Sequence, residues 1–141
     1  MINLPAPNRS TLTQAGYNIV QKQSPSLWLN DSILVTGEIP RTNDFGKGFP
    51  NHYSEVMERW KNDPLIKDDQ AIVLSIKDKG LVVITGCAHA GIINILNYAK
   101  ELTGEDRIYA VIGGMHLTVC SSQQDNSNVN NLFGILSCFF H

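Results

Sequence analysis

The sequence lacks paired cysteines, a basic excess, long apolar runs and internal repeats. Its three cysteines, Cys87, Cys120 and Cys138, are an odd number without Cys-x-x-Cys spacing, which argues against a disulfide framework or a zinc knuckle. A net charge of -2 gives no electrostatic footprint for nucleic acid. The N-terminus has no signal-peptide pattern, and the apolar run 132–140 is far shorter than a membrane span. We therefore expect a cytoplasmic protein that binds neither nucleic acid nor membrane.

The 141 residues, 43% of them hydrophobic, are enough for the core of one domain. Residues 1–26 are rich in Pro, Asn, Ser, Thr and Gln and predict an irregular N-terminal segment. Residues 121–128 are almost entirely polar, so we expect a divergent, disordered tail over 118–141. The predicted folded part is 27–117.

Alternating apolar residues and polar turns predict two hairpins. The first joins 27–29 to 32–37 through Asn30 and Asp31, and the second joins 71–76 to 81–85 through a turn that ends in Gly80. Between them, residues 54–61 predict one or two helical turns, with Ser54 as N-cap and with Val56, Met57 and Trp60 on one face.

After the second hairpin the apolar period changes from that of a strand to that of a helix. The spacing of Ile92, Ile95, Leu96 and Ala99 predicts a helix over 91–103, with Gly104 as its C-terminal stop. Residues 108–112 then predict a buried strand, parallel to 81–85. The fold class is therefore α/β, or α+β, since a hairpin precedes the strand, helix, strand unit.

Two histidines follow the two parallel strands, where open α/β sheets gather their ligands. His89 lies three residues after Gly86, and His116 follows Gly113 and Gly114. A shared metal site is one interpretation, and the alternative for His89 is a helix-start side chain bonded to backbone. His52 is more simply a solvated surface residue.

Three further side chains belong to the same predicted edge. Cys87 would gain thiolate character at a helix start, although an unpaired Cys is more often a small buried apolar residue. Asp68 and Asp69 precede the strand 71–76, whose start lies beside the end of 81–85 in an antiparallel hairpin. Either carboxylate could reach a shared ion, or both could belong to a solvated turn.

Four motifs carry a resemblance to a known family. They are ILVTGEIPRT at 33–42, DDQA at 68–71, GCAHAGIIN at 86–94 and IGGMHL at 112–117. Over 27–117 the sequence resembles the metallo-β-lactamase superfamily. In particular it resembles the branch of 7,8-dihydropterin-6-methyl-4-(β-D-ribofuranosyl)aminobenzene-5'-phosphate synthases, whose members carry Gly-Cys-Ser-His-x-Gly and Gly-Gly-Phe-His-Leu at these places.

The resemblance implies part of an αββα sandwich with metal ligands at one edge. It implies His89 as a metal ligand, in a place where many relatives have a bridging Asp, and His116 as a neighbour in the same site. Intact relatives would use zinc, iron or manganese, and their substrate would be a small molecule, phosphorylated or pterin-like. Cys87, Gly86, Gly113 and Gly114 would line the site.

The departures from the family pattern are as informative as the matches. The family's His-x-His-x-Asp-His string is absent, and so is its terminal His-Cys-Thr-Gly segment. We therefore expect a truncated hydrolase or synthase that binds little or no metal and is inactive alone. Its exposed sheet would favour self-association or a complementing N-terminal half. The alternatives are a non-catalytic phosphate- or anion-binding module and a gene fragment without a function of its own.

Overall fold

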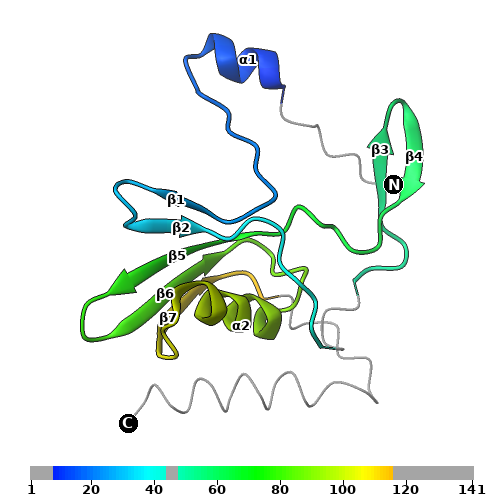
Figure 1. Cartoon of the computed structure of the whole chain (residues 1–141). Helices are drawn as coiled ribbons and strands as arrows, with labels where there is room; N and C mark the ends of the chain where they lie inside the picture. The colour runs from blue at the N-terminus through cyan, green and yellow to red at the C-terminus, as the bar shows by residue number, and fades with distance from the viewer. Residues whose placement is uncertain (1–7, 44–47, 116–141) are drawn as a thin grey trace.

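The computed structural model describes residues 8–43 and 48–115, and in them one five-stranded sheet carries a single long helix (Figure 1). The strand order is β1-β2-β5-β6-β7, and a separate hairpin is formed by β3 and β4. The elements are α1 (Arg9–Gln14), β1 (Ser26–Trp28), β2 (Ile33–Val35), β3 (Tyr53–Val56), β4 (Arg59–Asn62), β5 (Ala71–Ile76), β6 (Gly80–Thr85), α2 (Ile92–Thr103) and β7 (Ile108–Gly113).

Both predicted hairpins of the main sheet are confirmed. β1 and β2 pair antiparallel across a turn in which Asn30 and Asp31 have positive φ values of 52° and 63°. β5 and β6 pair antiparallel over their full length, from Ala71 opposite Thr85 to Ile76 opposite Gly80. The start of β5 and the end of β6 therefore lie side by side, as the hairpin argument requires.

The predicted strand, helix, strand unit is also confirmed. α2 ends at Gly104, whose left-handed φ of 68° lets its N–H bond to the Lys100 carbonyl. β7 then pairs parallel to β6, with Thr85 opposite Gly113. Because α2 runs back over the sheet between two parallel strands, its first turn and the ends of both strands lie at one edge.

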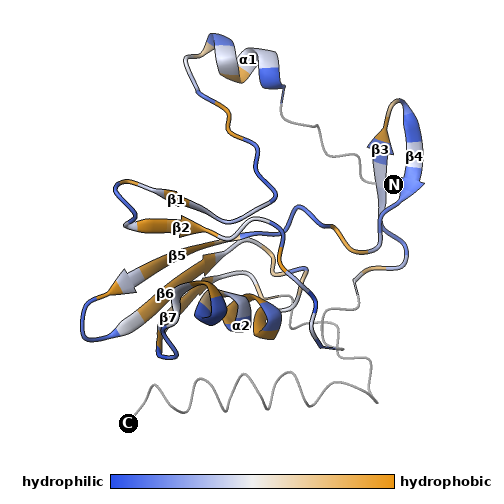
Figure 2. Ribbon diagram, viewed as in Figure 1, coloured by the Kyte–Doolittle hydropathy of each residue, from blue (hydrophilic) through white to orange (hydrophobic). Residues whose placement is uncertain are grey.

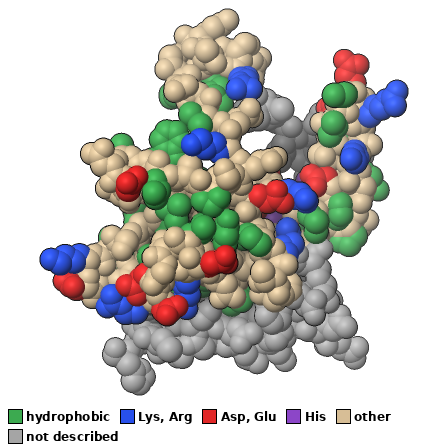
Figure 3. Space-filling model, in the orientation of Figure 1, with side chains coloured by type: hydrophobic (Ala, Val, Ile, Leu, Met, Phe, Trp, Pro, Cys, Tyr) green, Lys and Arg blue, Asp and Glu red, His purple; other side chains and the backbone are tan. Residues whose placement is uncertain are grey.

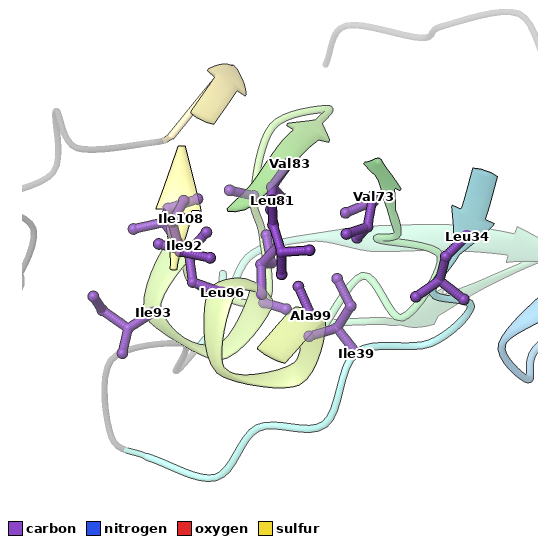
Figure 4. Packing of buried hydrophobic residues seen from close by; sticks show 14 residues of the cluster. Leu34, Ile39, Val73, Leu81, Val83, Ile92, Ile93, Leu96, Ala99 and Ile108 are labelled. Carbon is purple, nitrogen blue, oxygen red and sulfur yellow. The ribbon is translucent and has the colours of Figure 1, made fainter. Parts of the chain in front are cut away.

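The core lies between α2 and one face of the sheet. Leu81 and Val83 of β6 are fully buried against Ile95 and Leu96 of α2, and the predicted helix positions are all buried. Figure 4 shows Leu81 of β6 and Leu96 of α2 in the same cluster as Leu34 of β2, Val73 of β5 and Ile39. Figure 2 shows the hydrophobic colour along β2, β5 and β6 and on part of α2.

The opposite face of the sheet carries apolar side chains that remain exposed. Ile72 is 40% exposed, Ile76 38% and Ile112 54%. Strand β7 was predicted to be buried, and only its first residue, Ile108, is. The prediction is wrong for the rest of β7 because it assumed cover on both faces, whereas only the face toward α2 is covered in the described residues.

The segment predicted as helical turns over 54–61 is instead the β3–β4 hairpin. Glu55 pairs with Trp60 and Val56 with Arg59, so the supposed apolar face of a helix does not exist. Met57 and Glu58 form the turn, both with positive φ, as a type I′ turn requires. Val56, Met57 and Trp60 are all about half exposed or more. β-branched and aromatic side chains favour the strand here over helical spacing.

The N-terminal segment is less irregular than predicted, because α1 forms a short helix within it. Asn8 caps this helix by accepting a bond from the Thr11 N–H at 3.2 Å. None of its residues is buried, so α1 adds nothing to the core. The predicted tail, 118–141, lies outside the described residues. Within the described part of the chain no helix has the length and hydropathy needed to cross a membrane.

Candidate functional site

The ends of β6 and β7 come together closely enough that glycine is needed at residues 113 and 114. The Gly114 N–H donates to the Gly86 carbonyl at 2.7 Å. A Cβ on Gly113, whose φ is +132°, would lie 2.0 Å from the Thr85 carbonyl oxygen. The predicted site-lining residues Gly86, Gly113 and Gly114 therefore do meet at one edge of the sheet.

A tight turn joins this edge to the start of α2 and carries His89. Ala88 has a left-handed φ of 58°, which is strained for a residue with a Cβ, and its carbonyl accepts the Gly91 N–H at 2.9 Å. Ala88 and Ala90 are buried, whereas the side chain of His89 between them is half-buried. The turn thus anchors its two alanines in the core and presents the imidazole between them.

Asp69 holds this turn from the β5 side. Its Oδ2 accepts the Ala90 N–H at 2.8 Å, and the residue is only 9% exposed. Such a charge-assisted bond is stronger than a neutral one and satisfies a buried donor. The proximity of Asp69 to the His89 turn is as the hairpin predicted. Asp68, in contrast, is exposed and makes no hydrogen bond or ion pair within the described residues.

Two polar residues that were not predicted as site residues hold the turn from its other side. The Arg41 guanidinium donates to the His89 carbonyl at 3.1 Å and also to the Leu65 carbonyl. Asn94, buried in the first turns of α2, donates to the Ala90 carbonyl at 2.8 Å. Its Oδ1 accepts from the Thr42 N–H at 3.1 Å. Both residues lie inside the quoted motifs, and a buried Asn within an apolar helix was the available signal.

The base of the β3–β4 hairpin packs against the candidate histidine. The Phe49 and His89 rings meet edge to face, with centroids 5.6 Å apart and planes at 80°. His52 was predicted to be solvated, but it is half-buried, with its Nδ1 2.8 Å from the Asp63 carbonyl oxygen. This bond closes the base of the hairpin, so His52 has a structural role.

Of the remaining predicted site residues, the structure describes Cys87 but not His116. Cys87 is a free, exposed thiol, so the more frequent interpretation of a buried apolar Cys is wrong for it. His116 lies outside the described residues, and its distance from His89 stays a prediction. Thr85, which sequence reasoning passed over, ends β6 with its hydroxyl buried and without a hydrogen-bond partner among the described residues.

The described residues do not by themselves make a metal site. Within 8–43 and 48–115, no group of three or more His, Cys, Asp and Glu side chains is placed to hold a metal ion. Asp69 already uses one carboxylate oxygen for the Ala90 N–H. A zinc site normally takes three or four protein ligands. The residues present in the described part therefore do not fit a metal centre without further ligands.

The fold of the chain is similar to that of the metallo-β-lactamase superfamily. The solved structure of a metal-dependent hydrolase of the β-lactamase superfamily matches it with a TM-score of 0.63 and 26% identity, over 87% of this chain and 44% of that chain. The predicted fold class is thereby confirmed.

Two proteins of Methanocaldococcus jannaschii are similar in sequence. One is a 7,8-dihydropterin-6-methyl-4-(β-D-ribofuranosyl)-aminobenzene-5'-phosphate synthase, 31% identical over 65 residues, which are 46% of this chain and 22% of the synthase. The other is an uncharacterised protein, 31% identical over 102 residues, which are 72% of this chain and 36% of the other. The chain thus spans less than half the length of these relatives. No family model matches it.

Proposed function

We propose that this chain contributes one edge of a metal-dependent hydrolase or synthase site, with His89 as the residue that reaches the metal. The observation that supports the proposal is the fixed turn at the ends of β6 and β7. Asp69 and Asn94 bond the Ala90 N–H and carbonyl, and Arg41 bonds the His89 carbonyl. These bonds fix the backbone of the turn from which the His89 side chain projects.

The proposed substrate is a small molecule of the phosphorylated or pterin-like kind, by analogy with the synthase that the chain resembles. A divalent zinc, iron or manganese ion would polarise an oxygen of that substrate and lower the pKa of a bound water. His89, His116, Asp68 and Asp69 are the proposed metal-site residues. Since the described residues lack a complete ligand set, the proposal requires further ligands, which a complementing N-terminal half would supply.

Zinc titration of the isolated chain by calorimetry tests the proposal. Two His and one Asp fall short of a catalytic set, so we expect binding no tighter than about micromolar, weakened further by His89→Ala. His52→Asn is the matched control, because His52 is engaged at the base of the β3–β4 hairpin and should leave zinc affinity unchanged. Equal affinities for the wild type and His89→Ala would refute the role of His89.

One pair of observations favours a second candidate, the anion-binding module. α2 begins at Gly91 without a side-chain cap and without an acidic residue in its first turn. Thr85, on the α2 side of β6 and at the same edge, has a buried hydroxyl with no partner among the described residues. A helix start without a side-chain cap favours an anion, although Asp69 already places one carboxylate at the preceding turn. Titration with inorganic phosphate, compared between the wild type and Thr85→Val, tests it, and identical binding would refute it.

A further inference from the structure

A cleft lies between the β1–β2 hairpin and the last turn of α2. Its volume is about 630 Å³, within the range of roughly 300–1,000 Å³ that small-molecule sites occupy. α2 starts beside His89 and has 12 residues, which at the α-helical rise amount to about 18 Å. The cleft is therefore separate from the His89 turn, and an inference about it does not rest on the proposed function.

The floor of the cleft is apolar and its rim carries hydroxyl groups. Leu34 and Val73 stand opposite each other in the β2–β5 register, on the side of the sheet that α2 covers. Leu102 forms the wall, and Ser32 and Ser75 lie at the rim. Figure 3 shows hydrophobic side chains at the surface between the β1–β2 hairpin and α2. The cleft thus suits a ligand with an apolar body.

The cleft carries one negatively charged side chain and no positively charged one. Asp31 is the one ionisable residue that lines it, and it forms no ion pair with any described residue. The last turn of α2 adds the negative end of the helix dipole. Cations on neighbouring segments include Lys22, whose Nζ lies 5.8 Å from the Trp28 ring centroid, Lys77, which directly follows β5, and Lys100 of α2. None of the three lines the cleft.

The turn that carries Asp31 is held in an unfavourable backbone conformation. Leu29, Asn30 and Asp31 all have positive φ values, of 51°, 52° and 63°. Asn and Asp tolerate this conformation, but Leu does not. The Leu29 side chain is 73% exposed, so it gains little from packing. From this turn the Asp31 side chain lines the cleft.

We propose that this cleft binds a small amphiphilic cation. The apolar body of the ligand lies over Leu34, Val73 and Leu102, and its ammonium group lies between the Asp31 carboxylate and the last turn of α2. Ser32 and Ser75 accept hydrogen bonds from the remaining N–H groups. An anionic ligand of the same size is rejected, because no cation lines the cleft to receive it.

The experiment compares two probes of matched size in the full chain. Titration with 2-phenylethylammonium and with 3-phenylpropionate, followed by the backbone amide resonances, should give saturable shifts at Ser75 and Leu102 with the ammonium alone. Asp31→Asn should weaken ammonium binding about twofold to fivefold, the range for an exposed charged pair. Asp78→Asn is the matched control, because Asp78 lies in the β5–β6 turn outside the cleft and should leave the affinity unchanged.

A second variant tests the cleft itself. Ser75→Trp places a large side chain in the space above Val73, on a strand where aromatic residues are favoured, and should abolish binding while far-ultraviolet circular dichroism shows the sheet retained. Three results would each overturn the proposal: no saturable ammonium binding, equal binding of the carboxylate, or undiminished ammonium binding by either Asp31→Asn or a folded Ser75→Trp.

Discussion

Replacing Asp69 should destabilise the fold more than replacing Asp68, because the Asp69 carboxylate is buried and holds the His89 turn whereas Asp68 is exposed. In Asp69→Ala the Ala90 N–H loses its acceptor, and Ala90 is only 1% exposed, so water cannot readily replace it. A buried donor that loses a charged partner costs about 2–3 kcal/mol of unfolding free energy. Asp69→Asn keeps an acceptor oxygen and loses only the charge, so we expect about 1 kcal/mol. Asp68→Ala, at an exposed position, should change stability by no more than about 0.5 kcal/mol.

Urea unfolding followed by far-ultraviolet circular dichroism measures all three variants at equal m-value. Hydrogen exchange at the Ala90 amide adds a local measurement, since exchange should accelerate in Asp69→Ala and stay slow in Asp68→Ala. If the two alanine variants lost the same stability, or if Asp69→Asn were as damaging as Asp69→Ala, Asp69 would not hold the turn in the way described.

Three further outcomes are expected. Gly113→Ala should cost about 3 kcal/mol or more, because its Cβ would meet the Thr85 carbonyl at 2.0 Å, whereas Gly86→Ala, with nothing within 4 Å, should be nearly neutral. The side-chain hydrogen bond from Arg107 lowers the pKa of Glu105 from 4.5 to about 2. Ionised Glu105 therefore stabilises the fold fully above pH 4.5, and this contribution is lost as the pH falls toward 2. In Glu105→Gln the free energy of unfolding, measured by urea unfolding at each pH, should depend less on pH in that window. The exposed apolar sheet face should cause concentration-dependent sedimentation that Ile72→Lys reduces, and unchanged sedimentation in the variant would exclude that face.

The main sheet and α2 could be predicted because their local signals agree with their surroundings. The apolar alternation of β5 and β6, the polar turn between them and the helical spacing after Gly91 all indicate the elements that form. The β3–β4 hairpin could not, because Val56, Met57 and Trp60 also fit helical spacing. Its turn, Met57 and Glu58, lacks the Asn or Gly that usually marks positive φ.

The position of the candidate site could be predicted from the sequence, but most of the hydrogen bonds that hold the His89 turn could not. Strand order alone brings Asp69 to the His89 turn, and the bond to Ala90 follows from that proximity. Arg41 reaches the His89 carbonyl from a loop 48 residues earlier in the chain, and no local period encodes such a contact. The sequence also does not show which of Asp68 and Asp69 is buried, because that depends on how the turn packs.

The β5–β6 hairpin, α2 and β7 follow one another along the chain and pair in that same order. The bonded residues Asp69 and Ala90, for example, are 21 positions apart in the sequence. Contacts within this continuous stretch close shorter loops than the bonds from Arg41 and Thr42, 48 and 52 positions away, so less chain entropy is lost before they form. The His89 turn should therefore be assembled early, before any partner arrives. A partner would then meet a turn that is already ordered, and would lose less affinity to the entropy of ordering it.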